Sequence, residues 1–253
     1  MSTSKIAIIT GGSRGLGRDT ALQLATAGHD ILFTYRHNRE AAEASLQQIT
    51  ALGRQAHFLQ LDVGQIASFD TFAQQIKQLL QTHWQRDHFD FLINNAGVGA
   101  HAMIGQTSEE TFDTLLNVQF KGVYFLTQTL LPLLADGGRI VNVSTGLTRF
   151  ALPGYAAYAS MKGAIETFTK YLAKELGPRG ITANVIAPGA IDNDFNRAAF
   201  DHQPQIVEYI ASQTALGRVG QSSDIGKVVS FLCSEAASWV NAQRLEASGG
   251  MFL

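Results

Sequence analysis

Short apolar runs alternate with amphipathic stretches along the whole chain. The apolar runs have the length of buried strands, at residues 5–9, 30–35, 55–61, 89–93, 139–143, 182–186 and 244–247. Helical periodicity fills the intervals, at residues 18–27, 40–52, 66–82, about 108–135, 155–176, 194–216 and 223–234. This alternation, without a repeat or a linker, predicts a single α/β domain over residues 1–253: a doubly wound parallel sheet, Rossmann-like, with helices on both faces. We expect residues 193–216 to form a lid.

Capping signals mark several helix ends. Gly28 and Gly53 end the first two helices, and Gly177-Pro178 stops the one that begins at residue 155. Thr107 and Glu110 have the spacing of a capping box, which predicts the start of the long helix over about 108–135. We expect Pro132 to shape the last turns of that helix.

Composition narrows the class of protein. Apolar residues make up 45% of the chain and charged residues 16%, so a sizeable core is expected. The net charge of −2 gives no electrostatic case for binding nucleic acid or an anionic membrane. No apolar run reaches the length of a membrane span, and the first, Ile6–Ile9, is too short for a signal peptide. The simplest interpretation is a soluble cytoplasmic protein.

The single cysteine and the seven histidines carry no chemistry of their own. Cys233 lies in an apolar helical pattern and excludes an intrachain disulfide, so we interpret it as a core residue rather than a nucleophile. The histidines lack metal-ligand spacing, and we expect no metal in catalysis.

A glycine-rich turn follows the first strand. Its sequence is Thr10-Gly-Gly-Ser-Arg-Gly-Leu-Gly17, and a helix comes next. Strand, glycine turn and helix are the setting in which backbone N–H groups and a helix N-terminus hold a pyrophosphate. The spacing Gly-x-x-x-Gly-x-Gly differs from the usual dinucleotide fingerprint, and a purely structural tight turn is the alternative.

The tip of the second strand bears on the choice of cofactor. A carboxylate there would hold the ribose 2′-hydroxyl of NAD, but the strand ends in Thr34-Tyr35-Arg36. Arg36 and Arg14 are cations that can meet a 2′-phosphate, so the sequence predicts NADP(H), with NAD less favoured. Two solvated arginines are the plain alternative. Asp62, before Val63, ends the third strand and either accepts from an adenine amine or caps the next helix.

A tyrosine and a lysine form the main candidate catalytic pair. Tyr158 and Lys162 stand four residues apart in the helix over 155–176, so their side chains lie on one face. A nearby cation lowers the pKa of a phenol, and we expect Lys162 to do this for Tyr158. A hydroxyl from Thr145 or Ser144 can hold a carbonyl oxygen beside the phenol; we favour Thr145. Tyr155 is a rival phenol without a lysine at i+4, and a substrate-wall role suits it better.

Most of these groups follow strand ends. The glycine turn, Tyr35-Arg36, Asp62, Asn94–Gly97, Ser144-Thr145 and Pro188-Gly189 each come directly after a predicted strand. In a parallel sheet these ends meet at one edge, where ligands bind. We therefore expect all of them to line one crevice.

Taken together, these motifs resemble the short-chain dehydrogenase/reductase family over essentially the whole chain. The glycine turn, Asn94-Asn95-Ala96-Gly97, the Tyr158/Lys162 pair, Pro188-Gly189 and Ser248-Gly249-Gly250 match in place and order. The resemblance implies hydride transfer between NAD(P)(H) and an alcohol or carbonyl compound. It also implies a homo-oligomer, a tetramer or dimer, built on the helices at about 108–135 and 155–176.

Carried over residue by residue, the resemblance and the motifs give a candidate site. The cofactor would contact Gly11, Ser13, Arg14, Gly15, Leu16, Gly17, Tyr35, Arg36, Asp62, Val63, Asn95, Ala96, Gly97, Tyr158, Lys162, Pro188, Gly189, Ile191 and Asn193. Catalysis would involve Tyr158, Lys162, Thr145, Ser144 and Gln119.

Three positions depart from the family pattern. Thr145 replaces the family serine thirteen residues before the tyrosine. Gln119 stands where the family has an asparagine that supports a proton-relay water, and Asn117 lies two residues away on another face. Asn193 replaces a threonine that bonds the cofactor.

The overall hypothesis is an NADPH-dependent reductase of a ketone or aldehyde, and the alternative is a non-catalytic NADP(H)-binding regulator. An apolar or aromatic substrate wall is one interpretation of four aromatic residues, and core or lid packing is the other: Phe150, Tyr155, Phe195 and Phe200. Arg149, Arg197 and His202 can meet an anionic group of the substrate, but exposed, solvated charge is the interpretation that we favour. The apolar ending Met251-Phe252-Leu253 and Trp239 indicate packing against a neighbouring subunit or within the chain.

Overall fold

The computed structural model describes residues 4–202 and 204–253. The strands are β1 (Ile6–Ile9), β2 (Asp30–Tyr35), β3 (Ala56–Gln60), β4 (Phe89–Asn94), β5 (Leu134–Val143), β6 (Thr182–Pro188), β7 (Ile191–Asp192), β8 (Gly220–Gln221) and β9 (Arg244–Ala247). Seven of them form one parallel sheet in the order β3-β2-β1-β4-β5-β6-β9, and β7 pairs with β8 separately. The predicted doubly wound fold is confirmed.

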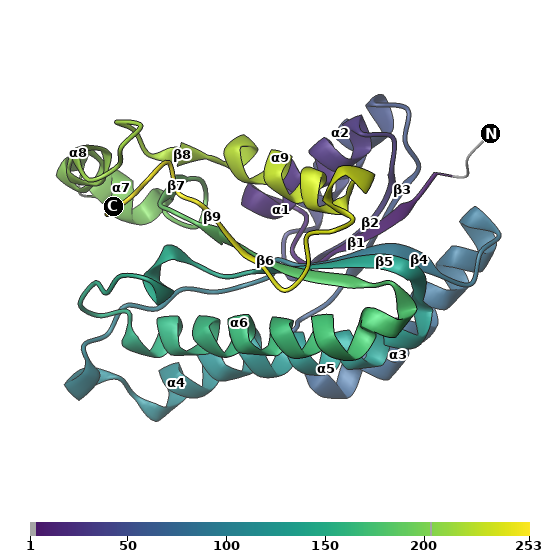
Figure 1. The fold of residues 1–253 in the computed structure, drawn as a ribbon, viewed down its shortest axis with the longest axis horizontal. Helices are drawn as coiled ribbons and strands as arrows, with labels where there is room; N and C mark the ends of the chain where they lie inside the picture. Colours follow the sequence, from purple (N-terminus) through teal and green to yellow (C-terminus); the bar gives the residue numbers. More distant parts are fainter. Residues whose placement is uncertain (1–3, 203) are drawn as a thin grey trace.

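The helices form a layer on each face of the sheet (Figure 1). They are α1 (Gly15–Thr26), α2 (Arg39–Ala51), α3 (Phe69–Leu79), α4 (Glu109–Leu116), α5 (Gly122–Leu130), α6 (Ala156–Leu176), α7 (Arg197–His202), α8 (Pro204–Ser212) and α9 (Ser222–Cys233). Helices α1, α2 and α9 cover one face, and α3, α4, α5 and α6 cover the other.

Strand β1 shows why the sheet needs both layers. Its four residues are fully buried, with Ala7 and Ile9 in the core under α1 and α9, and Ile6 and Ile8 in the core over α3 and α5. Successive side chains of a strand point to opposite faces, so an unbroken apolar run is what a strand covered on both sides requires.

The direction of winding reverses between β1 and β4, which lie side by side at the centre of the sheet. On one side of this point the sheet continues to β2 and β3, and on the other to β5, β6 and β9. In doubly wound sheets, ligands usually bind beside the loops that follow the strands at this point. The glycine turn and Asn95–Gly97 are those two loops.

The helix expected over about 108–135 is interrupted and shorter. A π-helical turn at Asn117–Lys121 separates α4 from α5, with the Gly122 N–H donating to the Asn117 carbonyl five residues back. Pro132 lies in a 3-10 turn after α5, and the chain is already strand at Leu134. Proline has no N–H to donate and its ring opposes continuation of an α-helix. The end of the helix at 135 was therefore placed too late.

The predicted capping box of that helix is also wrong. Ser108, not Thr107, is the N-cap, and its hydroxyl accepts from the Thr111 N–H at 3.2 Å. The Thr107 hydroxyl instead donates to the Met103 carbonyl at 3.1 Å. Adjacent hydroxyl residues make this one-residue error easy, because both suit a cap.

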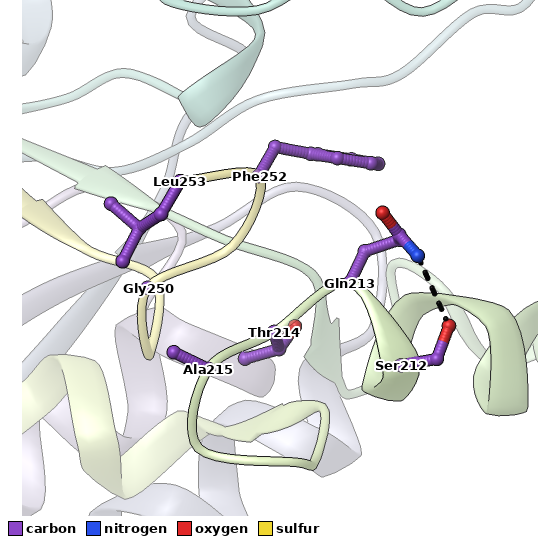
Figure 2. Close-up of a pocket in the computed structure, with 7 residues that line it drawn as sticks. All are labelled: Ser212, Gln213, Thr214, Ala215, Gly250, Phe252 and Leu253. Carbon is purple, nitrogen blue, oxygen red and sulfur yellow. Dashed lines mark hydrogen bonds between the residues drawn. The ribbon is translucent and has the colours of Figure 1, made fainter.

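The segment expected as a helical excursion contains α7 and α8, and it rejoins the C-terminal segment. Thr214 pairs with Met251 in an antiparallel bridge, and the Phe252 N–H donates to the Gln213 carbonyl at 2.8 Å. A surface hollow of about 380 Å³ lies between the two segments. Figure 2 shows the residues that line it. Its lining contains none of the predicted catalytic or cofactor residues: Ser212, Gln213, Thr214, Ala215, Gly250, Phe252 and Leu253.

Within the ranges that the structure describes, every helix is too short or too polar to span a lipid bilayer.

Candidate active site

Hydrogen bonds tie the glycine turn to β2 and to the loop after β4. The Thr10 hydroxyl accepts from the N–H groups of Asn95 and Ala96, both at 3.0 Å, and the Gly11 N–H donates to the Thr34 hydroxyl at 3.1 Å. Gly11 and Gly15 have φ angles of +68° and +54°, in the left-handed region that favours glycine. These bonds fix the conformation of the turn between β1 and β4.

The start of α1 is open to an anion. Among the residues that the structure describes, no side chain caps this helix and its first turn contains no acid, whereas Asn38 and Ser108 cap α2 and α4. Helix N-terminal N–H groups left without a cap attract negative charge. The turn and the helix together fit the pyrophosphate of a dinucleotide.

Close packing requires glycine at two of the predicted cofactor positions. A Cβ at Gly17 would lie 2.2 Å from the Gly11 carbonyl oxygen and 2.5 Å from the Asn95 amide nitrogen. That amide donates to the Thr10 carbonyl at 2.8 Å, so it ties the loop after β4 to the glycine turn. Gly97 faces Gln119 in the same way, with its Cβ position 3.0 Å from Oε1.

The rim near β2 differs in part from the expectation. Tyr35 is buried and its ring packs edge-on against Phe58 at 5.5 Å, so its side chain belongs to the core and only its backbone lies at the rim. Arg36 forms a 3.0 Å ion pair with Asp62, and Arg14 is exposed. Asp62 also accepts from the Gly64 N–H at 2.9 Å in a local turn, and it does not cap the helical turn that begins at Ile66.

On the opposite side of the glycine turn, the loop after β6 approaches it. The Gly189 N–H donates to the Ala247 carbonyl at 3.2 Å, and Ile191 is buried in β7. The Asn193 carboxamide oxygen accepts from the Phe195 N–H at 3.0 Å. Its amide nitrogen lies 3.9 Å from the Cβ position of Gly15, close enough to serve a ligand seated on the turn.

The remaining predicted cofactor residues also make packing contacts and hydrogen bonds within the protein. The Ser13 carbonyl accepts from the Ser45 hydroxyl at 3.0 Å, and Leu16 packs against the core under α1. The Val63 carbonyl oxygen closely approaches Gly122, where an added Cβ would stand 2.0 Å away. Backbone contacts of these residues toward the crevice stay predictions.

Tyr158 and Lys162 lie together on α6, as their spacing predicts. The Lys162 ammonium is 5.8 Å from the Tyr158 ring centroid and donates to the Val143 carbonyl at 2.8 Å. This bond seats the first turns of α6 against the end of β5. The phenol therefore lies at the same edge of the sheet as the loops after β1 and β4.

The electrostatics of this pair differ from the expectation. Burial lowers the pKa of Lys162 to about 7. Burial also raises the pKa of Tyr158, with a smaller contribution from Tyr155. The expected lowering by Lys162 is therefore wrong for this structure, because desolvation penalises the charged forms of both groups. Tyr158 carries its proton at neutral pH.

The two hydroxyls at the end of β5 have different surroundings. Ser144 is buried and its hydroxyl donates to Glu166 at 2.7 Å. Thr145 is half-buried, and its Oγ1 accepts from the Leu147 N–H at 3.3 Å, which leaves its own O–H as a donor. These contacts support Thr145 as the hydroxyl that meets a substrate.

Gln119 lies in the π-helical turn and is buried. Its amide nitrogen donates to the Val98 carbonyl, while its Oε1 has no hydrogen-bond partner within the described part of the chain. Asn117 is half-buried in the same turn. An unpaired buried carboxamide oxygen is costly and suits a site for a water molecule.

Sequence reasoning missed a group of charged residues behind Thr145. Glu166 accepts from Ser144, Thr148 and Arg244, and Arg149 pairs with Glu246 at 2.7 Å. Arg149 is exposed, as expected, but its charge is paired with Glu246 rather than only solvated. A signal existed, because Tyr158, Lys162 and Glu166 continue one i, i+4 series on α6.

Comparison with known proteins decides the family. A family model described as enoyl-(acyl carrier protein) reductase matches residues 11–252, nearly the whole chain. The chain belongs to the short-chain dehydrogenase/reductase family. It is an oxidoreductase of that family.

Relatives and solved structures agree with this membership. The 3-oxoacyl-[acyl-carrier-protein] reductase FabG of Staphylococcus aureus is 34% identical, with both chains covered in full. The promiscuous reductase LugOII, which catalyses keto-reduction at C1 during lugdunomycin biosynthesis, superposes with a TM-score of 0.94 at 37% identity, covering 99% of each chain. The angucycline C-6 ketoreductase LanV, solved with bound NADP, has a TM-score of 0.94 at 35% identity, covering 99% of this chain and 96% of LanV.

Lys162 should make folding stability depend on pH. Its pKa falls from an ordinary 10.5 to about 7 on folding, so between these values the unfolded chain binds more protons and stability rises with pH. We expect Lys162→Met to melt above the wild type at neutral pH and below, and this gap to narrow as the pH approaches 10. Calorimetric Tm values across that range test it. A gap that is independent of pH would contradict the assignment.

Proposed function

We propose that this protein is an NADP(H)-dependent reductase of a ketone or aldehyde. The observation that carries the proposal is the anchoring of Tyr158 and Lys162 beside the end of β5, at the same edge of the sheet as an open α1 N-terminus. An intact proton donor at a dinucleotide crevice disfavours a non-catalytic role.

The chain's own residues divide the work as follows. The glycine turn and α1 hold the pyrophosphate, and NADPH, when bound, supplies the hydride. Thr145 donates a hydrogen bond to the substrate carbonyl oxygen, an oxyanion-type role. Tyr158 gives its proton to that oxygen as negative charge develops on it. A phenol that is protonated at neutral pH suits the reductive direction.

Lys162 positions Tyr158 and holds the nicotinamide ribose in this proposal. Its bond to the Val143 carbonyl fixes the ammonium, and a pKa of about 7 makes its charge adjustable near neutral pH. Gln119 takes the place of the family's relay asparagine, with its unpaired Oε1 as the acceptor for a relay water.

The cofactor preference rests on the β2 rim. Strand β2 ends without an acid and is followed by Arg36, and Arg14 stands at the N-terminus of α1. A 2′-phosphate would compete with Asp62 for Arg36, since these two side chains are ion-paired. The NADP bound in LanV supports the same choice.

Aromatic side chains favour an apolar or aromatic substrate. Phe195 lies over Gly99, with its ring 2.8 Å from the position a Cβ there would take. His101 packs edge-on against Tyr155 at 5.2 Å. The first contact joins the predicted lid, residues 193–216, to the loop after β4. The second joins the loop before α6 to the same loop after β4. The ketoreductase names of LugOII and LanV support a ketone substrate.

We also propose a cytoplasmic homo-oligomer with no nucleic-acid or membrane partner. Large apolar side chains are exposed on α4, α5 and α6: Phe112, Tyr124, Phe125 and Tyr171. Tyr124 stacks on Phe168 at 4.5 Å, so α5 and α6 present one continuous aromatic surface. An exposed apolar patch of this kind marks an interface, and a second copy of the chain is the partner that we infer.

A carbonyl panel assayed with NADPH and NADH tests the activity through loss of reduced nicotinamide absorbance. In the active combination, Tyr158→Phe should lower kcat by about 10²–10⁴ because it removes the general acid. Thr145→Ala should lower kcat by about 10²–10³, the effect of losing one oxyanion donor, and Ser144→Ala by much less. Near-normal turnover of Tyr158→Phe would refute the catalytic assignment, and a large loss in Ser144→Ala alone would reverse the choice of hydroxyl.

The cofactor preference is tested with single arginine variants. Arg14→Ala and Arg36→Ala should each lower kcat/KM for NADPH by about 10–100-fold, the effect of losing a charge-assisted hydrogen bond, with little change for NADH. Arg18→Ala, an exposed arginine on the next turn of α1, is the matched control. A wild type that prefers NADH by a large factor would remove the NADP proposal.

The interface is tested by light scattering after size exclusion. Tyr171→Glu combined with Phe112→Glu should shift the protein to a smaller species, because it places charges on a buried apolar contact. Leu52→Glu changes an exposed apolar residue on the opposite layer and should leave the mass unchanged. If the wild type is a monomer, this part of the proposal fails.

A further inference from the structure

Helix α6 fixes the two residues that precede Thr145. Lys162 donates to the Val143 carbonyl at 2.8 Å, and Glu166, one turn later, accepts from the Ser144 hydroxyl at 2.7 Å. Both bonds come from the same face of the helix as Tyr158. The end of β5 is therefore held in register with the phenol up to residue 144.

Thr145 itself is held from another element, β9. Arg244 donates from Nη2 to the Thr145 carbonyl at 3.0 Å and to the Thr148 hydroxyl at 3.1 Å. Its Nε donates to Glu166 at 2.8 Å. One guanidinium thus joins the Thr145 backbone to the helix that carries Tyr158, and its planar, fixed geometry leaves little freedom.

The orientation of the Thr145 hydroxyl follows from these bonds. The residue is extended, with φ −158° and ψ 156°, and its Oγ1 accepts from the Leu147 N–H. With the carbonyl fixed by Arg244 and χ1 restricted by β-branching, the O–H has few directions left. A rotation of this peptide would move the hydroxyl away from a substrate oxygen.

Arg244 is in turn fixed by a second pair. Its Nη1 lies 3.0 Å from Glu246, which pairs with Arg149 through both carboxylate oxygens at 2.7 Å. Arg149 also donates to the carbonyls of Met251 and Phe252. The four charges alternate in sign, and Arg149 holds the pKa of Glu246 at about 2, so the carboxylate stays ionised.

A purely structural role explains this chain of ion pairs less well. The carboxylates of Glu166 and Glu246 are 18% exposed and Arg244 is 24% exposed, and ion pairs of this kind add little net stability because desolvation offsets attraction. The ion pairs contact the Ser144 hydroxyl, the Thr145 carbonyl and the Thr148 hydroxyl, all within three residues of Thr145. Precise placement of a hydroxyl benefits from such a network more than folding does.

We propose that Arg244 is a positioning residue, held by Glu166 and Glu246, that aims the Thr145 hydroxyl at the substrate carbonyl. The inference rests on the proposed reductase activity, and it adds a role for a residue that does not touch the substrate.

A double-mutant cycle tests it, with Arg244→Met, Thr145→Ala and the two combined. Arg244→Met should lower kcat by about 10–100-fold, since small misplacements of reacting groups have effects of this size. KM should change by less than about threefold, because the interaction is made in the transition state. In the Thr145→Ala background, Arg244→Met should have little further effect on kcat, whereas a general structural defect would lower it again. Arg244→Lys should be intermediate.

The matched control is Arg179→Met, at the opposite end of β5. Arg179 also pairs with an acid, Asp136 at 2.7 Å, and donates to backbone carbonyls including that of Leu131. Its loss should leave kcat unchanged, because Arg179 lies at the end of β5 away from Thr145.

Each outcome decides between the alternatives. Equal kcat losses from Arg244→Met in the wild-type and Thr145→Ala backgrounds overturn the proposal, as does an unchanged kcat in Arg244→Met. If Arg244→Met does not fold, Thr148→Val takes its place in the cycle, because it removes the hydroxyl that Arg244 and Glu166 both bond. Additive effects of Thr148→Val and Thr145→Ala on kcat would then overturn the proposal. Full activity of Tyr158→Phe would instead refute the proposed function.

Discussion

The hydrogen bond from the Lys162 ammonium to the Val143 carbonyl sets the register of α6 against the sheet. A helix lying on a sheet can slide by a residue with little change in apolar area, but a buried cation needs a partner at one place. This bond therefore selects one alignment of the helix. The positions of Tyr158 and Glu166 follow from it, because they lie one turn before and one turn after Lys162.

A polar ladder through the core supports the same alignment. The Asn142 carboxamide accepts from Asn94 at 2.8 Å and donates to the Thr169 hydroxyl at 2.9 Å, and Asn94 also donates to Thr127 at 3.0 Å. Four buried groups on β4, β5, α5 and α6 thus bond to one another. Such a network specifies a unique arrangement, since any shift would leave buried amides without partners.

The local signals in the sequence predicted the strand and helix order and the parallel sheet, because apolar runs and glycine turns are short-range features. What they could not predict depends on contacts between distant residues. The raised pKa of Tyr158 comes from burial by other elements, and Tyr35 turns into the core against Phe58 of the next strand. Arg149 and Arg244 lie far apart in the chain, so only the fold shows that Glu246 joins them.

The contact between Gly97 and Gln119 couples the side-chain sizes that these two positions can accommodate. The carboxamide of Gln119 lies 3.0 Å from where a side chain at 97 would begin, and its nitrogen is already engaged with the Val98 carbonyl. The longer amide consequently occupies volume that a methyl group at 97 would need. These two sites should covary among homologues, with a bulkier residue at 97 tolerated only where the helix residue is shorter.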